Sequence, residues 1–431
     1  MTEGLLPRML RVRQHFERPV VRDVAAEVHT QLRRLNLHER VHPGQSVAIT
    51  AGSRGIANIA QIIKAAVEHF RELGAAPFIV PAMGSHGGGT AEGQRRIIEE
   101  YGITEEFVGA PIRATMETVI VDTTEQGIPV HFDRFAFEAD HVLVCGRVKP
   151  HTGFVGEIES GLHKMMLIGL GKHEGAKIYH RAIQEYSFLE IIRAVADVVM
   201  RRCGVVAGLA IVENAYDETA LIEAVPPAEF FAREKELLRL ARRWMPRLPF
   251  RYADVLIVDQ IGKNISGTGM DTNVIGRKYN DHAATERDEV CCKRIVVRSL
   301  TRETHGNACG LGLAEFTTER CARQVDIVAT RINCVTGGHP TGGAIPITFP
   351  NDREAIVAAL QTIGLTPPDR ARVMHITDTL HLSELLISEA YMPEVQRRDD
   401  LEVIREPQPM QFDERGDLLP VLPEWISSPE H

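Results

Sequence analysis

Strand-like apolar runs alternate with helix-periodic segments along most of this chain, and this alternation constrains the fold more than any other feature. Residues 46–50 and 77–81 are typical of strands. Between them, residues 57–73 place apolar side chains on one helical face, and Gly74 ends the segment. The sequence therefore predicts an α/β fold with mostly parallel sheets.

The same alternation predicts the organisation of the rest of the chain. A length of 431 residues exceeds one ordinary core, so we expect two domains. The prolines at 246 and 249 block a helix and indicate a linker. We expect an N-terminal α/β domain over 1–245, a C-terminal α/β domain over 250–395, and a tail over 396–431 that packs back on the N-terminal domain. Further strands are expected at 142–148, 208–213, 255–259, 325–330 and 373–376, and further helices at 92–101, 188–202, 228–244 and 354–363.

Charge and composition exclude several classes of protein. The net charge is −9 and no Lys/Arg-rich run occurs, which argues against nucleic acid and anionic membranes as partners. No stretch of 18 apolar residues and no signal-peptide core are found, so we expect a cytoplasmic protein. The seven cysteines include no C-x-x-C motif and are expected to be reduced thiols.

Polar, glycine-containing clusters directly follow four of the expected strands. They cover residues 51–55 (AGSRG), 84–89 (GSHGGG), 149–153 (KPHTG) and 260–263 (QIGK). Ligands of open α/β sheets bind beyond the carboxyl ends of the strands. We therefore expect the four clusters to converge on one cleft, between the two domains.

Two of these clusters carry a histidine that could act in acid–base chemistry. The glycines around His86 allow a close approach to a ligand, but a turn histidine that caps the helix beginning near Thr90 fits equally well. His151 follows Pro150, and a histidine is the usual general base near neutral pH. Taken alone, a solvated loop histidine is the better explanation of His151.

Lys164 precedes an apolar run and is expected to be half-buried. Burial makes a lysine less basic and more nucleophilic, although its amine could also extend to water. His163, His173 and His180 lie nearby, but their spacing is not a recognised zinc pattern.

Three further residues suit a small carboxylate. Gln260 and Lys263 offer an amide and an ammonium in one turn, and Arg54 offers a guanidinium fork. Helix capping or a surface position is the alternative for each.

Taken in order, these residues resemble the nickel-pincer-nucleotide lactate racemases. The family carries an Arg after the first strand, a His in a Gly-rich turn, a Pro-His pair, a Lys, a later His, and a Gln and Lys three apart. The resemblance runs from about residue 45 to 350. The matching residues are Arg54, His86, Pro150 with His151, Lys164, His180, Gln260 and Lys263.

The resemblance implies a role for each residue. Lys164 would hold the nickel-pincer nucleotide, a nickel complex of pyridinium-3,5-bisthiocarboxylic acid mononucleotide, through a thioamide bond, and His180 would bind the nickel. His86 and His151 would act as acid and base on opposite faces of the substrate while a hydride passes to the cofactor and back. The remaining three residues, Arg54, Gln260 and Lys263, would hold the substrate carboxylate.

The implied activity is that of an isomerase, a racemase or epimerase that inverts C2 of a 2-hydroxy acid, with cofactor-building enzymes as indirect partners. Ala51 stands where lactate-specific members carry an Asp, and the segment from His151 to Lys164 is longer than theirs. A larger or more polar 2-hydroxy acid is therefore at least as good a candidate as lactate. Two alternatives stay open: an α/β lyase or hydrolase of a sugar acid without the pincer cofactor, and a non-catalytic carboxylate-binding protein. The sequence does not indicate the oligomeric state.

Overall fold

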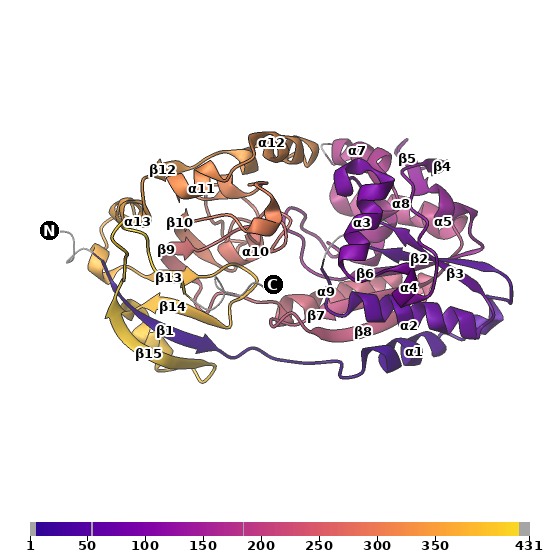
Figure 1. The fold of residues 1–431 in the computed structure, drawn as a ribbon, viewed down its shortest axis with the longest axis horizontal. Coiled ribbons are helices and arrows are strands. Elements are labelled where there is room, and N and C mark those ends of the chain that lie inside the picture. The colour runs from indigo at the N-terminus through magenta and orange to yellow at the C-terminus, as the bar shows by residue number, and fades with distance from the viewer. Residues whose placement is uncertain (1–5, 53–54, 184, 422–431) are drawn as a thin grey trace. The chain divides into compact units, whose positions relative to one another are not determined.

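The structure is a computed structural model and describes residues 6–52, 55–183 and 185–421. The chain divides into two compact units (Figure 1). Arg18–Met245 form the first, which contains most of the residues that carry the resemblance to lactate racemases and is therefore called the racemase-like unit. Met1–Glu17 and Pro246–His431 form the second, called the split unit because two separate segments build it.

The racemase-like unit is built on a five-stranded sheet with the order β3-β2-β6-β7-β8. The first four strands are parallel, and β8 runs antiparallel to β7. A separate hairpin pairs β4 with β5. The strands are β2 (Ser46–Ala51), β3 (Ala76–Pro81), β4 (Thr118–Thr123), β5 (Pro129–Asp133), β6 (His141–Arg147), β7 (Val205–Glu213) and β8 (Thr219–Val225). The helices are α1 (Val24–Arg33), α2 (Ile59–Glu72), α3 (Ala91–Glu100), α4 (Glu105–Val108), α5 (Arg134–Glu138), α6 (Leu162–Lys164), α7 (Lys172–Ala182), α8 (Phe188–Arg202) and α9 (Phe230–Trp244).

This sheet is buried on both faces, which explains why its strands are continuous apolar runs. Alternate residues of one strand point to opposite faces. In β2, Ala48 joins a core with α8 and α9, whereas Val47 and Ile49 join a second core with α1 and α2. Because β3, β2, β6 and β7 are parallel, they end at the same edge of the sheet, and the polar loops that follow β2, β3 and β6 lie at that edge.

The split unit contains an eight-stranded mixed sheet with the order β12-β11-β10-β9-β13-β14-β1-β15. The strands from β12 to β13 in this order are parallel, and the remaining pairings are antiparallel. The strands are β1 (Arg8–Gln14), β9 (Tyr252–Val258), β10 (Cys291–Val297), β11 (Phe316–Thr318), β12 (Ile347–Phe349), β13 (Val373–Ile376), β14 (Glu384–Ser388) and β15 (Leu401–Pro409). The helices are α10 (Thr272–Ile275), α11 (Glu319–Arg323), α12 (Ile327–Thr336), α13 (Asp352–Gln361) and α14 (Met392–Val395).

The α/β class with mostly parallel sheets is confirmed, but two parts of the predicted domain organisation are wrong. The first residues belong to the split unit, because β1 pairs with β14 and β15. The described part of the tail, residues 396–421, belongs to the split unit instead of the N-terminal domain, because β15 completes the split unit's sheet. Figure 1 shows the indigo strand β1 beside the yellow strands of the C-terminal half.

The strand expected at 325–330 is also wrong. The side chain of Asp326 accepts hydrogen bonds from the backbone N–H groups of Val328 and Ala329, and thereby begins α12. The β-branched residues that suggested a strand, Ile327 and Val328, are exposed on this helix. Within the described residues, no helix is long and apolar enough to cross a membrane.

Candidate active site

The segment that carries Lys164 is a short helix interrupted by a π-helical turn. Lys164 ends α6 and is half-buried, as the apolar run after it predicts. The turn, η4 (Met165–Gly169), follows at once and leads into α7. Single π-helical turns occur frequently at functional sites. Lys164 therefore lies where the helix is locally widened.

Loops from three parallel strands pack on η4. A Cβ atom on Gly52, after β2, would lie 3.6 Å from Met165 Cε. A Cβ on Gly84, after β3, would lie 3.0 Å from Ile168 Cγ2, and one on Gly146, in β6, 2.7 Å from Met165 Cγ. The distance at Gly146 is shorter than ordinary Cβ contacts, the one at Gly84 is tighter than most, and Gly84 also has φ +61°, so glycine favours this close approach. The structure thus brings the loops after β2 and β3 and the end of β6 to the turn that follows Lys164.

His86 lies in the loop after β3 and is half-buried. Thr90, not His86, caps α3, because the Thr90 hydroxyl accepts the hydrogen bond from the Gly93 N–H. The next residue, Gly87, has φ +67°, and a Cβ there would lie 2.6 Å from the Gln94 backbone nitrogen. The capping interpretation of His86 is therefore wrong, and its loop has the tight, glycine-dependent shape of a ligand-binding turn.

A buried lysine that the sequence analysis missed supports this loop. Lys172 is fully buried and pairs with Asp133, with 2.9 Å between Nζ and Oδ2. It also donates to the Pro81 carbonyl and to Gln94 Oε1, while the Gln94 amide donates to the Gly84 carbonyl. Burial raises the pKa of Asp133 and lowers that of Lys172. The backbone of Lys172 has φ +54°, which the sequence does not reveal.

His151 is held in one orientation by its own loop. Its Nδ1 accepts hydrogen bonds from the backbone N–H groups of Gly153 (2.9 Å) and Phe154 (3.1 Å). Its ring stacks on Phe154 with centroids 4.3 Å apart, and Phe154 stacks in turn on Phe188 at 4.0 Å. Because Nδ1 is an acceptor, the proton of the neutral ring lies on Nε2. The imidazole therefore presents an Nε2–H donor.

Glu159 holds the backbone of the same loop by hydrogen bonding. It is 1% exposed, and its Oε2 accepts the His151 backbone N–H at 2.8 Å. Its other oxygen accepts from Arg242 at 2.6 Å. Glu157, by contrast, is exposed and pairs with Lys235. Of the two glutamates near His151, only Glu159 is thus placed to position it.

The remaining residues predicted in this unit are described only in part. Arg54 lies outside the described residues, and His180 lies in α7 with its side chain outside them. His163 is buried and contacts Glu234, with 2.9 Å between Nδ1 and Oε2. His173 Nδ1 is buried and has no hydrogen-bond partner among the described residues. The described histidines close to Lys164, His163 and His173, therefore have separate environments.

Gln260 and Lys263 lie in the split unit, on the turn after β9. The Gln260 side-chain nitrogen is 3.5 Å from Asp378 Oδ2, and the Lys263 amine donates to the Gly267 carbonyl at 2.5 Å. Asp378 is buried and accepts from His381 Nδ1 at 2.9 Å. This imidazole–carboxylate pair was missed in the sequence, since only the fold brings it beside Gln260. The cleft that would join these residues to those of the other unit stays a prediction.

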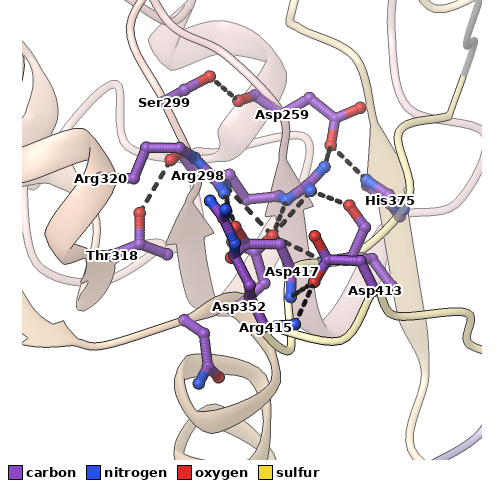
Figure 2. Close-up of polar contacts among 12 residues, drawn as sticks. Asp259, Arg298, Ser299, Thr318, Arg320, Asp352, His375, Asp413, Arg415 and Asp417 are labelled. Carbon is purple, nitrogen blue, oxygen red and sulfur yellow. Dashed lines mark hydrogen bonds and ion pairs between the residues drawn. The ribbon is translucent and has the colours of Figure 1, made fainter.

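A buried network of charges fills the adjacent strand ends of the split unit (Figure 2). Arg298 donates to Asp259 and, at 2.7 Å, to Asp352, and His375 Nε2 lies 2.5 Å from Asp259 Oδ1. Burial alone would raise the pKa of Asp259, but His375 and Arg298 outweigh it and lower that pKa to about 2.

The same network explains why the tail packs here. Leu418 donates its N–H to Asp352 and accepts from Arg298, and Val421 donates to Asp259. Charged partners for backbone groups are strong anchors. The described part of the tail is therefore bound to the split unit by groups that follow β9, β10 and β12.

Comparisons with known proteins bear on the N-terminal part of the chain. Residues 8–188 match the family model of the lactate racemase N-terminal domain. Two solved structures are similar to this chain. The lactate racemase apoprotein from Thermoanaerobacterium thermosaccharolyticum has 13% identity and a TM-score of 0.46, over 67% of this chain and 74% of that one. A protein from Thermotoga maritima has 14% identity and a TM-score of 0.45, over 64% of this chain and 70% of that one.

None of the curated protein sequences matches the chain. The matched residues 8–188 include His86, His151, Lys164 and His180. Over this part of its length, the chain is similar to the lactate racemase N-terminal domain.

Proposed function

We propose that this protein is a racemase or epimerase that inverts C2 of a 2-hydroxy acid with a nickel-pincer nucleotide bound to Lys164. The family match over residues 8–188 carries the proposal. The half-buried position of Lys164, at the turn where the loops after β2 and β3 pack, supports it. Fold alone does not decide activity, so the proposal depends on these particular groups.

The residues around Lys164 suit such a group. A lysine amine can form the thioamide bond, and an imidazole such as that of His180 suits the square-planar field of Ni(II). The unpartnered Nδ1 of His173, on the first turn of α7, is a buried polar atom that a bound polar group could satisfy. When bound, the nucleotide would supply an acceptor for the hydride of the carbinol carbon.

His86 and His151 would handle the hydroxyl proton. His86 would take this proton from one configuration of the substrate, while His151 donates a hydrogen bond from Nε2. To act as the base for the other configuration, His151 must accept a proton on Nε2. Its Nδ1 would then carry hydrogen, so the N–H groups of Gly153 and Phe154 must turn away. The two directions of the reaction would therefore use the loop differently.

The substrate carboxylate would be held by Arg54, Gln260 and Lys263. Ala51 lacks the carboxylate that lactate-specific members carry at this position, and we propose a substrate larger or more polar than lactate. A sugar acid with a 2-hydroxyl is a suitable class.

The test is to produce the full chain together with the cofactor-building enzymes and to measure its intact mass and nickel content. We expect an adduct on Lys164 and about one nickel per chain. Lys164→Arg, and protein made without those enzymes, are the controls and should carry no adduct. An unmodified chain under both conditions contradicts the proposal and favours the cofactor-free lyase or hydrolase.

The reaction itself is followed in D₂O, with chiral chromatography of a panel of 2-hydroxy acids. A hydrogen transferred as hydride does not exchange with water, so the inverted product should keep its C2 hydrogen. Deuterium at C2 would instead indicate proton abstraction. Binding of a 2-hydroxy acid without turnover by the loaded protein would favour the carboxylate-binding alternative.

A further inference from the structure

Two helices of the racemase-like unit bring together three side chains that the proposed function does not use. His29 lies on α1, and His69 and Glu72 lie on α2, which packs against it. Residues three apart on a helix share a face, so His69 and Glu72 both point toward the same side of α2. One ligand atom from each of the three lies within 4.8 Å of the others.

His69 is the unusual member of this cluster. It is only 3% exposed, and neither of its ring nitrogens has a hydrogen-bond partner among the described residues. Nδ1 of His29 is buried and unpartnered in the same way. Buried polar atoms are nearly always hydrogen-bonded, so three unpartnered nitrogens on neighbouring rings indicate a binding site for a ligand. The two ring centroids are 6.3 Å apart, which leaves no direct bond between the rings to explain them.

The protonation state of His69 suits a metal. Burial is the main cause that lowers its pKa to about 4, and nearby His29 lowers it further. The ring is consequently neutral at pH 7, and the neutral imidazole is the form that binds metals.

The third group can complete the site with a small movement. Ligands 2.0–2.1 Å from a tetrahedral ion lie about 3.4 Å apart, somewhat closer than the atoms do here. The Glu72 side chain is 53% exposed and pairs with the exposed Arg33, with 3.2 Å between Oε2 and Nη2. Exposed ion pairs are weak, so a cation can displace Arg33 and draw the carboxylate inward.

We propose that His29, His69 and Glu72 bind one divalent transition-metal ion of the zinc class and thereby clamp α1 to α2. Two imidazoles and one carboxylate are a known zinc ligand set, with a water in the fourth position. Calcium and magnesium prefer oxygen ligands throughout and do not suit this site. The inference is independent of the racemase proposal.

The probe is Co²⁺, whose visible absorption reports tetrahedral binding, added to the full chain after treatment with a chelator. We expect wild-type protein to bind one equivalent more than His29→Gln and Glu72→Gln, and Zn²⁺ to displace it. His38→Gln, an exposed histidine next to α1, is the matched control and should bind like wild type. His180→Gln should also keep this equivalent, so the result does not depend on the nickel site.

A second readout is thermal unfolding with and without Zn²⁺. A ligand that binds only the folded state should raise Tm by about 5 °C in wild type and in His38→Gln, but not in His29→Gln or Glu72→Gln. Both substitutions are at positions with partial exposure, and circular dichroism checks that the variants fold. Equal Co²⁺ binding by wild type and by folded His29→Gln and Glu72→Gln variants, or no binding by wild type, would overturn the proposal.

Discussion

The two units use the carboxyl ends of their parallel strands in opposite ways. In the racemase-like unit, the loops after β2 and β3 are rich in glycine, and His86 and His151 are half-buried. In the split unit, groups after β9, β10 and β12 form a buried network in which Asp352 is completely covered. The tail then closes over that network.

The contrast appears in the two types of histidine. His375, beside Asp259, is 1% exposed and serves only the network, whereas His151 has a half-buried ring whose Nδ1 is fixed by its own loop. The racemase-like unit therefore leaves these imidazoles partly exposed, whereas the split unit uses the corresponding end of its sheet for a buried, stabilising network. The split unit also has a half-buried imidazole, that of His381, which lies with Asp378 near Gln260.

The largest expected effect tests the network. Arg298→Met should lower the free energy of unfolding of the split unit by about 3–5 kcal/mol, because it leaves Asp259 and Asp352 as uncompensated buried charges. Urea unfolding followed by hydrogen exchange assigns the loss to β9, β10 and β13. Arg323→Met, which removes an exposed pair with Glu319, is the control and should change stability by less than about 0.5 kcal/mol. Equal effects would mean that the network is not what stabilises the unit.

The corresponding change in the racemase-like unit should affect activity instead. His151→Ala should lower kcat about 10²–10⁴-fold in the cofactor-loaded protein, as expected for loss of a general acid–base group. Urea unfolding should detect a smaller change than for Arg298→Met, since the half-buried ring accepts hydrogen bonds from loop backbone and stacks on Phe154. His38→Ala serves as the control. A variant that lost stability but kept kcat would show that His151 is structural.

Acid should affect the network in a defined direction. The folded-state pKa of Asp259 is lowered to about 2 from an ordinary value of 3.8. The stability that its carboxylate contributes, about 2–3 kcal/mol, is fully present above pH 4 and is lost as the pH falls toward 2. In urea titrations at several pH values, Asp259→Asn should flatten this part of the curve. Asp369→Asn, at an exposed position, should leave the slope unchanged.

The smallest effect concerns Gln260, which lies with Lys263 on the turn of the split unit that we propose holds the substrate carboxylate. Gln260→Ala should raise KM about tenfold and leave kcat nearly unchanged, because it removes a binding contact made equally in the ground and transition states. Steady-state kinetics with the best substrate of the panel measures both. A fall in kcat without a change in KM would place Gln260 in the chemistry and weaken the contrast between the units.

Local pattern was sufficient where one element is buried against its neighbours along its whole length. The helix 188–202 and the strand 373–376 have the expected bounds because the helix buries one apolar face along its length and all four strand residues are buried. The pattern failed at 325–330, where β-branched residues are exposed and the Asp326 side chain starts a helix. Exposure and capping depend on tertiary context, which local sequence does not contain.

The same limit applies to the site. His86, His151 and Lys164 were found from their neighbours in sequence and from a family pattern, and their roles remain predictions. Lys172 was missed because its partner Asp133 lies on another element and because its left-handed backbone conformation cannot be recognised from the sequence. His29 and His69 were likewise unremarkable until two helices placed them together.

The position of β1 has a consequence for biosynthesis. Met9 pairs with Ser388 and with Gln408, so during translation β1 can find these partners only after the whole intervening chain has been made. The racemase-like unit lies wholly between these partners in the sequence and can close its own sheet while the nascent chain is still growing. Until then the β1 segment stays unpaired. A fragment that starts at Pro246 would contain β14 and β15 but would lack β1, which lies between them in the sheet.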